Sequence, residues 1–258
     1  MERNLTEKIA LVTGAGRGIG RGIARQLAQR GAAVALAELD RAAGEEALAE
    51  IVALGGRAIF LLTDVRDEAS IEGAVAATIQ AFGGLNVLVN NAGNDMHYDA
   101  TRMSQREWSD ALAMNLGSAW LCSKYAIPPM IARGGGVIVN IASVHATMTM
   151  YGNFPYAVTK SGLLGLTRSL ALDYGDRNVR VVAVSPGYVR TRRVTDDFDA
   201  APDPAAEEAR VIALHPIKRI GTPDDVGHLV AFLVSDEAGY ITGTEITIDG
   251  GLTARYPD

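Results

Sequence analysis

The sequence predicts an α/β fold, in which a Rossmann-type, doubly wound, seven-stranded parallel sheet carries helices on both faces. Short runs rich in Val, Ile and Leu alternate with longer amphipathic segments between residues 8 and 248, and this alternation is typical of parallel sheets covered on both sides. Glycine contributes 28 of the 258 residues and punctuates the alternation without a fixed period. No linker-like stretch divides the chain, so we expect residues 1–258 to form a single domain.

Continuous apolar runs predict strands that are buried on both faces. These runs lie at residues 8–13, 33–38, 57–63, 86–90, 137–142, 179–184 and 245–248. The segments between them predict helices at 19–30, 41–54, 67–82, 104–131, 155–174 and 223–235. In the first helix Ile19, Ile23 and Leu27 recur at helical spacing, and Gly31 follows as a C-terminal stop. Residues 187–222, rich in Arg, Asp, Pro and Ala, interrupt the alternation; we call them the flap and expect them to cover a substrate as a lid.

Composition and charge exclude several classes of protein. The chain is 48% hydrophobic and 21% charged, with a net charge of −6, which fits a globular domain and gives no electrostatic footprint for nucleic acid or an anionic membrane. The three basic residues Arg190, Arg192 and Arg193 are too few to form a binding surface for nucleic acid or an anionic membrane. The N-terminus lacks an apolar signal region, and no apolar run approaches the ~18 residues of a membrane span. We expect a cytoplasmic protein, and the single cysteine, Cys122, excludes an internal disulfide and is expected to be buried for structural reasons.

A glycine turn joins the first strand to the first helix, where backbone N–H groups and the helix dipole suit a pyrophosphate. The general G-x-G-x-x-G fingerprint matches in no register, but T-G-x-x-x-G-I-G does, with glycines at 14, 18 and 20; a purely structural turn is the alternative. Glu38 ends the second strand 18 residues after Gly20, where a carboxylate is expected to hold the adenosine ribose and repel a 2′-phosphate. The sequence therefore favours NAD over NADP, although Arg17 could face a 2′-phosphate.

A second group of residues indicates proton-transfer chemistry. Tyr156 and Lys160 lie four residues apart, on one face of a helix, and a cation beside a phenol is expected to lower its pKa from about 10 toward neutrality. Ser143 lies 13 residues before Tyr156, just after the strand 137–142, and residues 90–93 also follow a strand. Ligands bind at that edge of a parallel sheet, so we expect these groups to meet there.

The chain resembles the short-chain dehydrogenase/reductase family from Lys8 to Gly251, and its length near 250 is similar to the single-domain branch of that family. The motifs that carry the resemblance are Thr13-Gly14 with Gly18-Ile19-Gly20, Asp64-Val65, Asn90-Asn91-Ala92-Gly93, Asn115, Ser143, Tyr156 with Lys160, the turn Pro186-Gly187-Tyr188-Val189-Arg190-Thr191, and Asp249-Gly250-Gly251. Two departures are small and remove no catalytic group: Ala142 stands where serine is common and Ser185 where alanine is common.

The resemblance implies an oxidoreductase that transfers hydride between a nicotinamide cofactor and an alcohol or carbonyl compound. It implies that Tyr156 exchanges the substrate proton, Lys160 holds the nicotinamide ribose, Ser143 orients the substrate oxygen, and Asn115 holds a water. It implies a homotetramer that pairs helices 104–131 and 155–174 and the last strand. The cofactor site that it implies comprises Gly14, Arg17, Gly18, Ile19, Gly20, Glu38, Asp64, Val65, Asn91, Ala92, Gly93, Tyr156, Lys160, Pro186, Gly187, Val189 and Thr191.

The substrate is less determined. Polar candidates are Asn94, Asp95, His97, His145, Asn153, Arg190 and Arg192, and apolar candidates are Met148, Met150, Phe154 and Tyr188. The polar set favours a sugar, a polyol or another small polar alcohol, while the apolar set leaves open an NADPH-dependent reductase of 3-oxoacyl or other lipid-like ketones. Histidines 97, 145, 215 and 228 lack ligand spacing, so we expect no metal. Two other classes remain as alternatives: a hydrolase using Ser143 and His145, although no G-x-S-x-G elbow surrounds the serine, and a non-catalytic nucleotide sensor.

Overall fold

The computed structural model describes residues 4–254, and within them a seven-stranded parallel sheet has the order β3-β2-β1-β4-β5-β6-β7. The strands are β1 Ile9–Thr13, β2 Ala33–Glu38, β3 Arg57–Leu62, β4 Val87–Asn90, β5 Gly136–Ile141, β6 Val179–Pro186 and β7 Glu245–Ile248. The predicted fold class is confirmed. From β1 the chain builds the sheet outward through β2 and β3, and it then returns to β4 on the other side of β1 and builds toward the opposite edge. The strand order thus reverses between β1 and β4, and open α/β sheets bind ligands at such a point.

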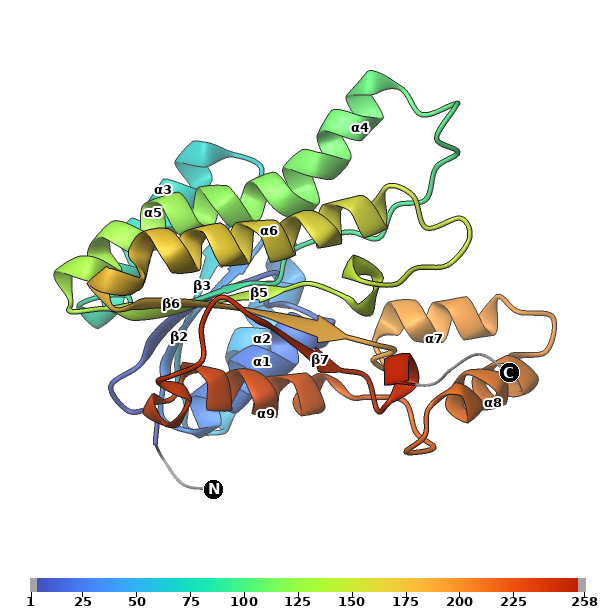
Figure 1. Ribbon diagram of the computed structural model, residues 1–258. Coiled ribbons are helices and arrows are strands. Elements are labelled where there is room, and N and C mark those ends of the chain that lie inside the picture. Colours follow the sequence, from blue (N-terminus) through green and yellow to red (C-terminus); the bar gives the residue numbers. More distant parts are fainter. Residues whose placement is uncertain (1–3, 255–258) are drawn as a thin grey trace.

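Helices cover both faces of the sheet (Figure 1). One layer contains α1 Gly18–Gln29, α2 Arg41–Ala53 and α9 Pro223–Val234; the other contains α3 Glu68–Phe82, α5 Ser118–Ala132 and α6 Tyr156–Tyr174. Successive residues of β1 serve the two layers: Ala10 and Val12 join the core under α1 and α9, and Leu11 joins the core under α3 and α5. Cys122 of α5 lies buried in this second core, and burial raises its thiol pKa to about 12, so its predicted structural place is confirmed.

The predicted helix 104–131 corresponds to a continuous helical segment over residues 105–132, but this segment is not α-helical throughout. The chain forms α4 Gln105–Leu112, a π-helical turn at Ala113–Gly117, and then α5. Ser104 and Glu107 start α4 with a reciprocal capping box. The wider turn at 113–117 displaces the following residues around the helix axis, and such insertions are frequent at functional sites.

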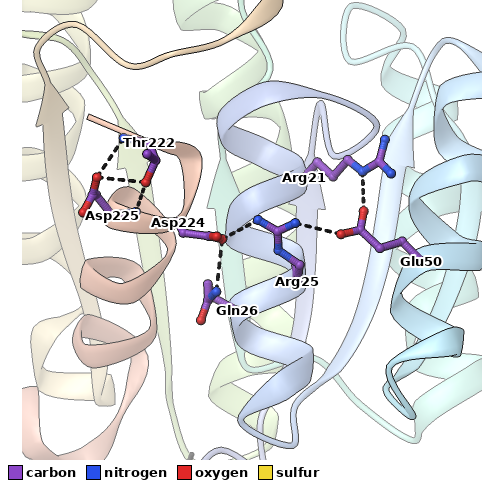
Figure 2. Close-up of polar contacts among 7 residues, drawn as sticks. All are labelled: Arg21, Arg25, Gln26, Glu50, Thr222, Asp224 and Asp225. Atoms are coloured by element: carbon purple, nitrogen blue, oxygen red, sulfur yellow. Dashed lines mark hydrogen bonds and ion pairs between the residues drawn. The ribbon is translucent and has the colours of Figure 1, made fainter. Parts of the chain in front are cut away.

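Ion pairs fasten α1 to both of its neighbours (Figure 2). Arg25 of α1 donates to Glu50 of α2 (2.8 Å) and to Asp224 of α9 (2.6 Å). Gln26 also donates to Asp224 (3.0 Å), and Arg21 donates to Glu50 (2.5 Å). The side chains of Arg21 and Arg25 are about three-quarters buried. The network therefore fixes α1, the helix that follows the glycine turn.

The flap is folded, with two short helices, α7 Arg192–Asp199 and α8 Pro204–Leu214, which extend beyond the carboxyl edge of the sheet (Figure 1). Phe198, Val211 and Ile220 form a small buried core of their own. Among residues 4–254 no helix is long and apolar enough to cross a membrane. The same residues contain no group of three His, Cys, Asp or Glu side chains arranged to hold a metal ion.

Candidate functional site

A cavity of about 1430 Å³ lies at the carboxyl edge of the sheet. Sites for one small ligand occupy ~300–1,000 Å³, so this cavity has room for a dinucleotide together with a smaller molecule. Most of the predicted site residues line it, namely Gly14, Arg17, Gly18, Ile19, Glu38, Asp64, Val65, Asn91, Ala92, Gly93, Asn94, Asp95, His97, Ser143, His145, Met148, Met150, Asn153, Tyr156, Lys160, Gly187, Tyr188, Val189, Thr191 and Arg192.

Two predicted substrate residues face elsewhere. Phe154 stacks on Trp108, with ring centroids 5.8 Å apart, and Arg190 forms an ion pair with Glu208 of α8. Neither lines the cavity. The expectation that Phe154 and Arg190 surround the substrate is therefore wrong, because each side chain is engaged by a neighbouring helix.

The glycine turn leaves the start of α1 open to the cavity. Gly14 and Gly18 have φ of 62° and 52°, a region that favours glycine, and a Cβ on Gly20 would lie 2.2 Å from the Gly14 carbonyl oxygen. Gly20 thus serves the tight turn rather than the cavity wall. Helix α1 has neither a capping side chain nor an acidic residue in its first turn, whereas α2, α3, α4, α7, α8 and α9 are all capped. Its free N–H groups fit an anionic pyrophosphate.

Glu38 is anchored by backbone amides at the end of β2. Its Oε2 accepts from Gly16 N (3.0 Å), and its Oε1 accepts from Leu39 N (2.8 Å) and Asp40 N (3.0 Å). Arg17, the cation that could face a 2′-phosphate, forms an ion pair with Asp40. Asp40 therefore neutralises Arg17 and leaves Glu38 as the uncompensated charge of this wall. Asp40 was not predicted as a residue of this site. Its position as the N-cap of α2, two residues after Glu38, was the feature of the sequence that could have indicated it.

The loops after β3 and β4 complete the cofactor side of the cavity. Arg66 lowers the pKa of Asp64 through a side-chain hydrogen bond, so this carboxylate beside Val65 stays charged. Asn91 Nδ2 donates to the carbonyl oxygens of Thr13 (2.9 Å) and Gly14 (3.1 Å). Asn91 thereby holds the loop after β4 against the glycine turn, and Asn91, Ala92 and Gly93 line the cavity.

Ser143, Tyr156 and Lys160 meet at the opposite wall. Ser143 follows β5, and Tyr156 begins α6 with Lys160 one turn later. Lys160 Nζ donates to the Ile141 carbonyl oxygen (2.8 Å) and lies 5.5 Å from the centre of the Tyr156 ring. Ser143 and Lys160 are only 7% and 5% exposed. The structure thus brings together the residues that were predicted from strand ends and helical spacing.

The protonation states differ from the sequence-based expectation. Burial raises the pKa of Tyr156 to about 12, against an opposing interaction with the Ser143 hydroxyl, and burial lowers the pKa of Lys160 to about 8. The expected lowering of the Tyr156 pKa by Lys160 is therefore wrong for the protein alone, because loss of solvent disfavours both charged forms. At neutral pH the phenol keeps its proton and the lysine is mostly charged.

Asn115 lies one layer behind the cavity wall, in the π-helical turn. Its Oδ1 accepts from Asn94 N (2.7 Å), and its Nδ2 donates to Asn94 O (2.8 Å). A Cβ on Gly93 would lie 2.9 Å from Asn115 Oδ1 and 3.7 Å from Lys160 Nζ. Asn115 therefore fixes the backbone of the loop at 93–94 that separates it from Lys160.

The substrate end of the cavity is polar. Asp95 forms an ion pair with Arg193 of α7 (2.8 Å), and His97 Nε2 lies 3.1 Å from the same carboxylate. His145 lies edge-on to Tyr156, with ring centroids 6.0 Å apart, and burial lowers its pKa. Arg193 was not among the predicted site residues, because no local pattern connects it with Asp95.

The flap reaches both ends of the cavity. Pro186 ends β6, and the isolated bridge between Val189 and Gly221 closes the base of the flap. Thr191 caps α7, and its Cγ2 would lie 3.2 Å from a Cβ on Gly18. The start of α7 thus packs directly over the glycine turn.

Comparison with known proteins gives matches over nearly the whole chain. The family model described as enoyl-(acyl carrier protein) reductase matches residues 14–253. A cyclohexanol dehydrogenase from Acinetobacter sp. (strain SE19) is 35% identical over 99% of this chain and 98% of that protein. The 3-oxoacyl-[acyl-carrier-protein] reductase of Escherichia coli (strain K12) is 38% identical over 96% of this chain and 98% of that protein. The ligand-free structure of the aldohexose dehydrogenase of Thermoplasma acidophilum has a TM-score of 0.90 at 33% identity, covering 100% of this chain and 98% of that one.

Proposed function

Since this chain belongs to the short-chain dehydrogenase/reductase family, we propose that it interconverts a neutral, hydroxylated secondary alcohol and its carbonyl compound, with NAD preferred over NADP. Family membership makes it an oxidoreductase that acts on alcohol groups and uses a nicotinamide dinucleotide. The observation that carries the proposal is one cavity with the uncapped N-terminus of α1 at one wall and Ser143, Tyr156 and Lys160 at the other.

The cofactor side of the cavity fits a dinucleotide. The amides of Gly18 and Ile19 would face the pyrophosphate and Glu38 the adenosine ribose, while Asp64 and Val65 would border the adenine. The walls nearer to Tyr156 would hold the nicotinamide half; Asn91, Ala92, Gly93, Lys160, Gly187, Val189 and Thr191 line them, and Pro186 lies just before Gly187 at the end of β6. When bound, the nicotinamide ring accepts or returns the hydride.

Tyr156 is the proposed acid in carbonyl reduction and the proposed base in alcohol oxidation. Its raised pKa keeps a proton on the phenol oxygen at neutral pH, which suits donation to a substrate oxygen. In the reverse direction the phenolate needs stabilisation, and the charge of Lys160, 5.5 Å from the ring, provides it. Ser143 would orient the substrate oxygen between itself and the phenol, and Asn115 acts as a positioning residue through the loop at 93–94.

A neutral hydroxylated substrate fits the charges at the substrate end. Arg193 is paired with Asp95, and Arg192 lies 3.7 Å from Asp196, so neither arginine offers an uncompensated positive charge to an anion. Asn153, His145 and Tyr188 add neutral polar groups to the same wall. The related cyclohexanol and aldohexose dehydrogenases act on cyclic, uncharged molecules by their names, which supports this class.

Reduction of a lipid-like or 3-oxoacyl ketone is the second candidate. Met148 and Met150 line the cavity while remaining 49% and 60% exposed, and they could contact an acyl chain entering from outside. The relative from Escherichia coli is named for such a reaction. The polar residues closer to Tyr156 favour the hydroxylated alcohol.

The exposed apolar surface of α5 and α6 supports the proposed homotetramer. Trp120 is 51% exposed, Val158 43% and Leu172 84%, and large apolar side chains of this kind are often covered by another subunit. Light scattering coupled to size-exclusion chromatography tests this: a mass of one chain would contradict it.

A substrate panel tests the proposed function. Sugars, polyols, cyclic alcohols, hydroxy acids and acyl ketones are assayed with NAD and NADP by the absorbance of the reduced nicotinamide. We expect turnover of neutral hydroxylated alcohols with NAD, and no turnover by Tyr156→Phe. Cofactor binding without turnover of any compound would favour the non-catalytic sensor, and faster reduction of acyl ketones with NADPH would favour the second candidate.

A further inference from the structure

We infer that Asp95 and Arg193 together select substrates that carry a second, uncharged hydroxyl group besides the one that reacts. This inference rests on the proposed function and adds a recognition pair to it. Asp95 lies in the loop after β4, and Arg193 lies in the first turn of α7. Both line the same cavity as Tyr156.

Arg193 and His97 flank the Asp95 carboxylate, and only Arg193 bonds to it. Its Oδ2 lies 2.8 Å from Arg193 Nη2. Its Oδ1 is buried and accepts no hydrogen bond from residues 4–254, although His97 Nε2 lies 3.1 Å away. His97 is itself held by the Gly152 carbonyl oxygen, 2.9 Å from Nδ1. The side chain of Asp95 is 26% exposed, and because Oδ1 is buried this exposure belongs to the rest of the side chain.

Asp95 also acts on the groups that carry the proposed chemistry. Burial dominates the pKa values of Tyr156 and Lys160, and the charge of Asp95 in addition raises both. The same charge opposes the effect of burial on His145. Asp95 thus shares both the cavity wall and an electrostatic interaction with these three side chains.

An acceptor beside a donor is complementary to a hydroxyl group. A hydroxyl donates one hydrogen bond and accepts others, so it can donate to Asp95 Oδ2 while accepting from Arg193. A substrate carboxylate would be attracted by Arg193 and repelled by Asp95, and an ammonium group would meet the opposite conflict. The pair therefore favours a neutral hydroxyl over either charged group.

The partners of Arg193 support this assignment. Its Nε lies 3.5 Å from Asp197, in addition to the Asp95 contact, so it faces two carboxylates and carries no excess positive charge toward the cavity. A site that hydrogen-bonds a substrate hydroxyl discriminates strongly against an analogue without it, because its own polar groups are then left unpaired.

Matched cyclic alcohols test the inference. The wild-type protein is assayed with cyclohexanol, with the 1,2-, 1,3- and 1,4-cyclohexanediols, and with the corresponding methylcyclohexanols, in which a methyl group replaces the second hydroxyl. We expect kcat/KM for at least one diol to exceed the values for cyclohexanol and for the corresponding methylcyclohexanol by about 10- to 100-fold. This factor corresponds to the contribution of one hydrogen bond to a charged group. Asp95→Asn and Arg193→Gln should reduce this ratio to about threefold or less, and because the charge of Asp95 also acts on Tyr156 and Lys160, the ratio within each variant is the measured quantity and not its absolute rate.

Asp196→Asn is the control, because it removes a carboxylate from the same helix that contacts Arg192 rather than Arg193. It should retain the wild-type ratio, and the affinity of each variant for NAD verifies that it is folded. An equal loss for diol and cyclohexanol, or an unchanged ratio in Asp95→Asn, would overturn the inference while leaving the proposed function intact. Failure of the wild-type protein to oxidise any alcohol would instead overturn the proposed function.

Discussion

The proposed preference for NAD over NADP should depend on Glu38, and the substitution Glu38→Gln tests this dependence with the least change in side-chain shape. Three backbone amides, those of Gly16, Leu39 and Asp40, donate to the carboxylate at 2.8 to 3.0 Å. These bonds keep the charge at the end of β2, so Glu38 cannot easily turn away from a 2′-phosphate. Glutamine retains an acceptor oxygen for the ribose hydroxyls but removes the repulsion.

The magnitude follows from the local charges. Arg17 and Asp40 form an exposed ion pair, so their charges largely cancel and Glu38 supplies the net charge of this wall. At ~4 Å, two unit charges interact by about 1 kcal/mol in water and about 4 kcal/mol near a protein surface. This range corresponds to a ~5- to ~1,000-fold preference for NAD. Glu38→Gln should remove most of it, and adding Asp40→Asn should free Arg17 and move the preference further toward NADP, while asparagine preserves the N-cap of α2.

Isothermal titration calorimetry with NAD and NADP measures the ratio of the two Kd values for each protein. Glu45→Gln is the matched control, because Glu45 is an exposed carboxylate of α2 whose partner is Arg41, and it should leave the ratio unchanged. A wild-type protein that binds NADP more tightly, or a Glu38→Gln variant with the wild-type ratio, would refute the reasoning.

Three further outcomes are expected. Tyr156→Phe should abolish turnover and leave the Kd for NAD within about twofold, because only the exchangeable proton is lost, whereas Lys160→Ala should weaken both; calorimetry and the absorbance assay separate these effects, and substantial turnover by Tyr156→Phe would contradict the assignment. Trypsin should cleave the apo protein within residues 192–210 of the flap, where most residues are exposed, and more slowly with NAD and substrate; equal rates would exclude a lid. Arg219 holds the pKa of Asp225 below its usual value, so Asp225→Asn should lower the free energy of unfolding by about 1 kcal/mol at neutral pH. Because a lowered pKa stabilises the fold above the ordinary value and loses this effect as the pH falls through the folded one, the difference in urea unfolding should shrink below about pH 4; a constant difference would contradict it.

The sequence was sufficient to predict the sheet, its helical layers and most of the cavity wall. Parallel strands end at one edge, so residues just after a strand, such as Glu38, Asn91 and Ser143, can be placed together without any knowledge of side-chain contacts. Helical spacing likewise placed Tyr156 and Lys160 on one face of α6. These inferences need only local patterns and the topology.

Contacts between segments far apart in the chain could not be predicted in this way. The pairing of Arg193 with Asp95 depends on how the flap folds over the loop after β4, and no periodicity specifies that approach. The pKa of Tyr156 was wrongly predicted for a related reason: its spacing from Lys160 was visible in the sequence, but the burial that raises its pKa depends on residues from several distant segments. The π-helical turn around Asn115 also has no local pattern of its own.

The first turn of α7 is where the two ends of the cavity meet. Thr191 packs over Gly18 in the cofactor turn, and two residues later Arg193 reaches Asp95 at the substrate end. A dinucleotide lying between α1 and the flap would fix Thr191, and through the rigid helix it would also fix Arg193. A bound cofactor would therefore hold the start of the flap in place, which is a physical reason for the flap to be protected from trypsin by NAD and substrate together more than by substrate alone. Arg25 fastens α1 to α2 and α9 (Figure 2), so the glycine turn against which Thr191 packs is joined to a helix that is held on both sides.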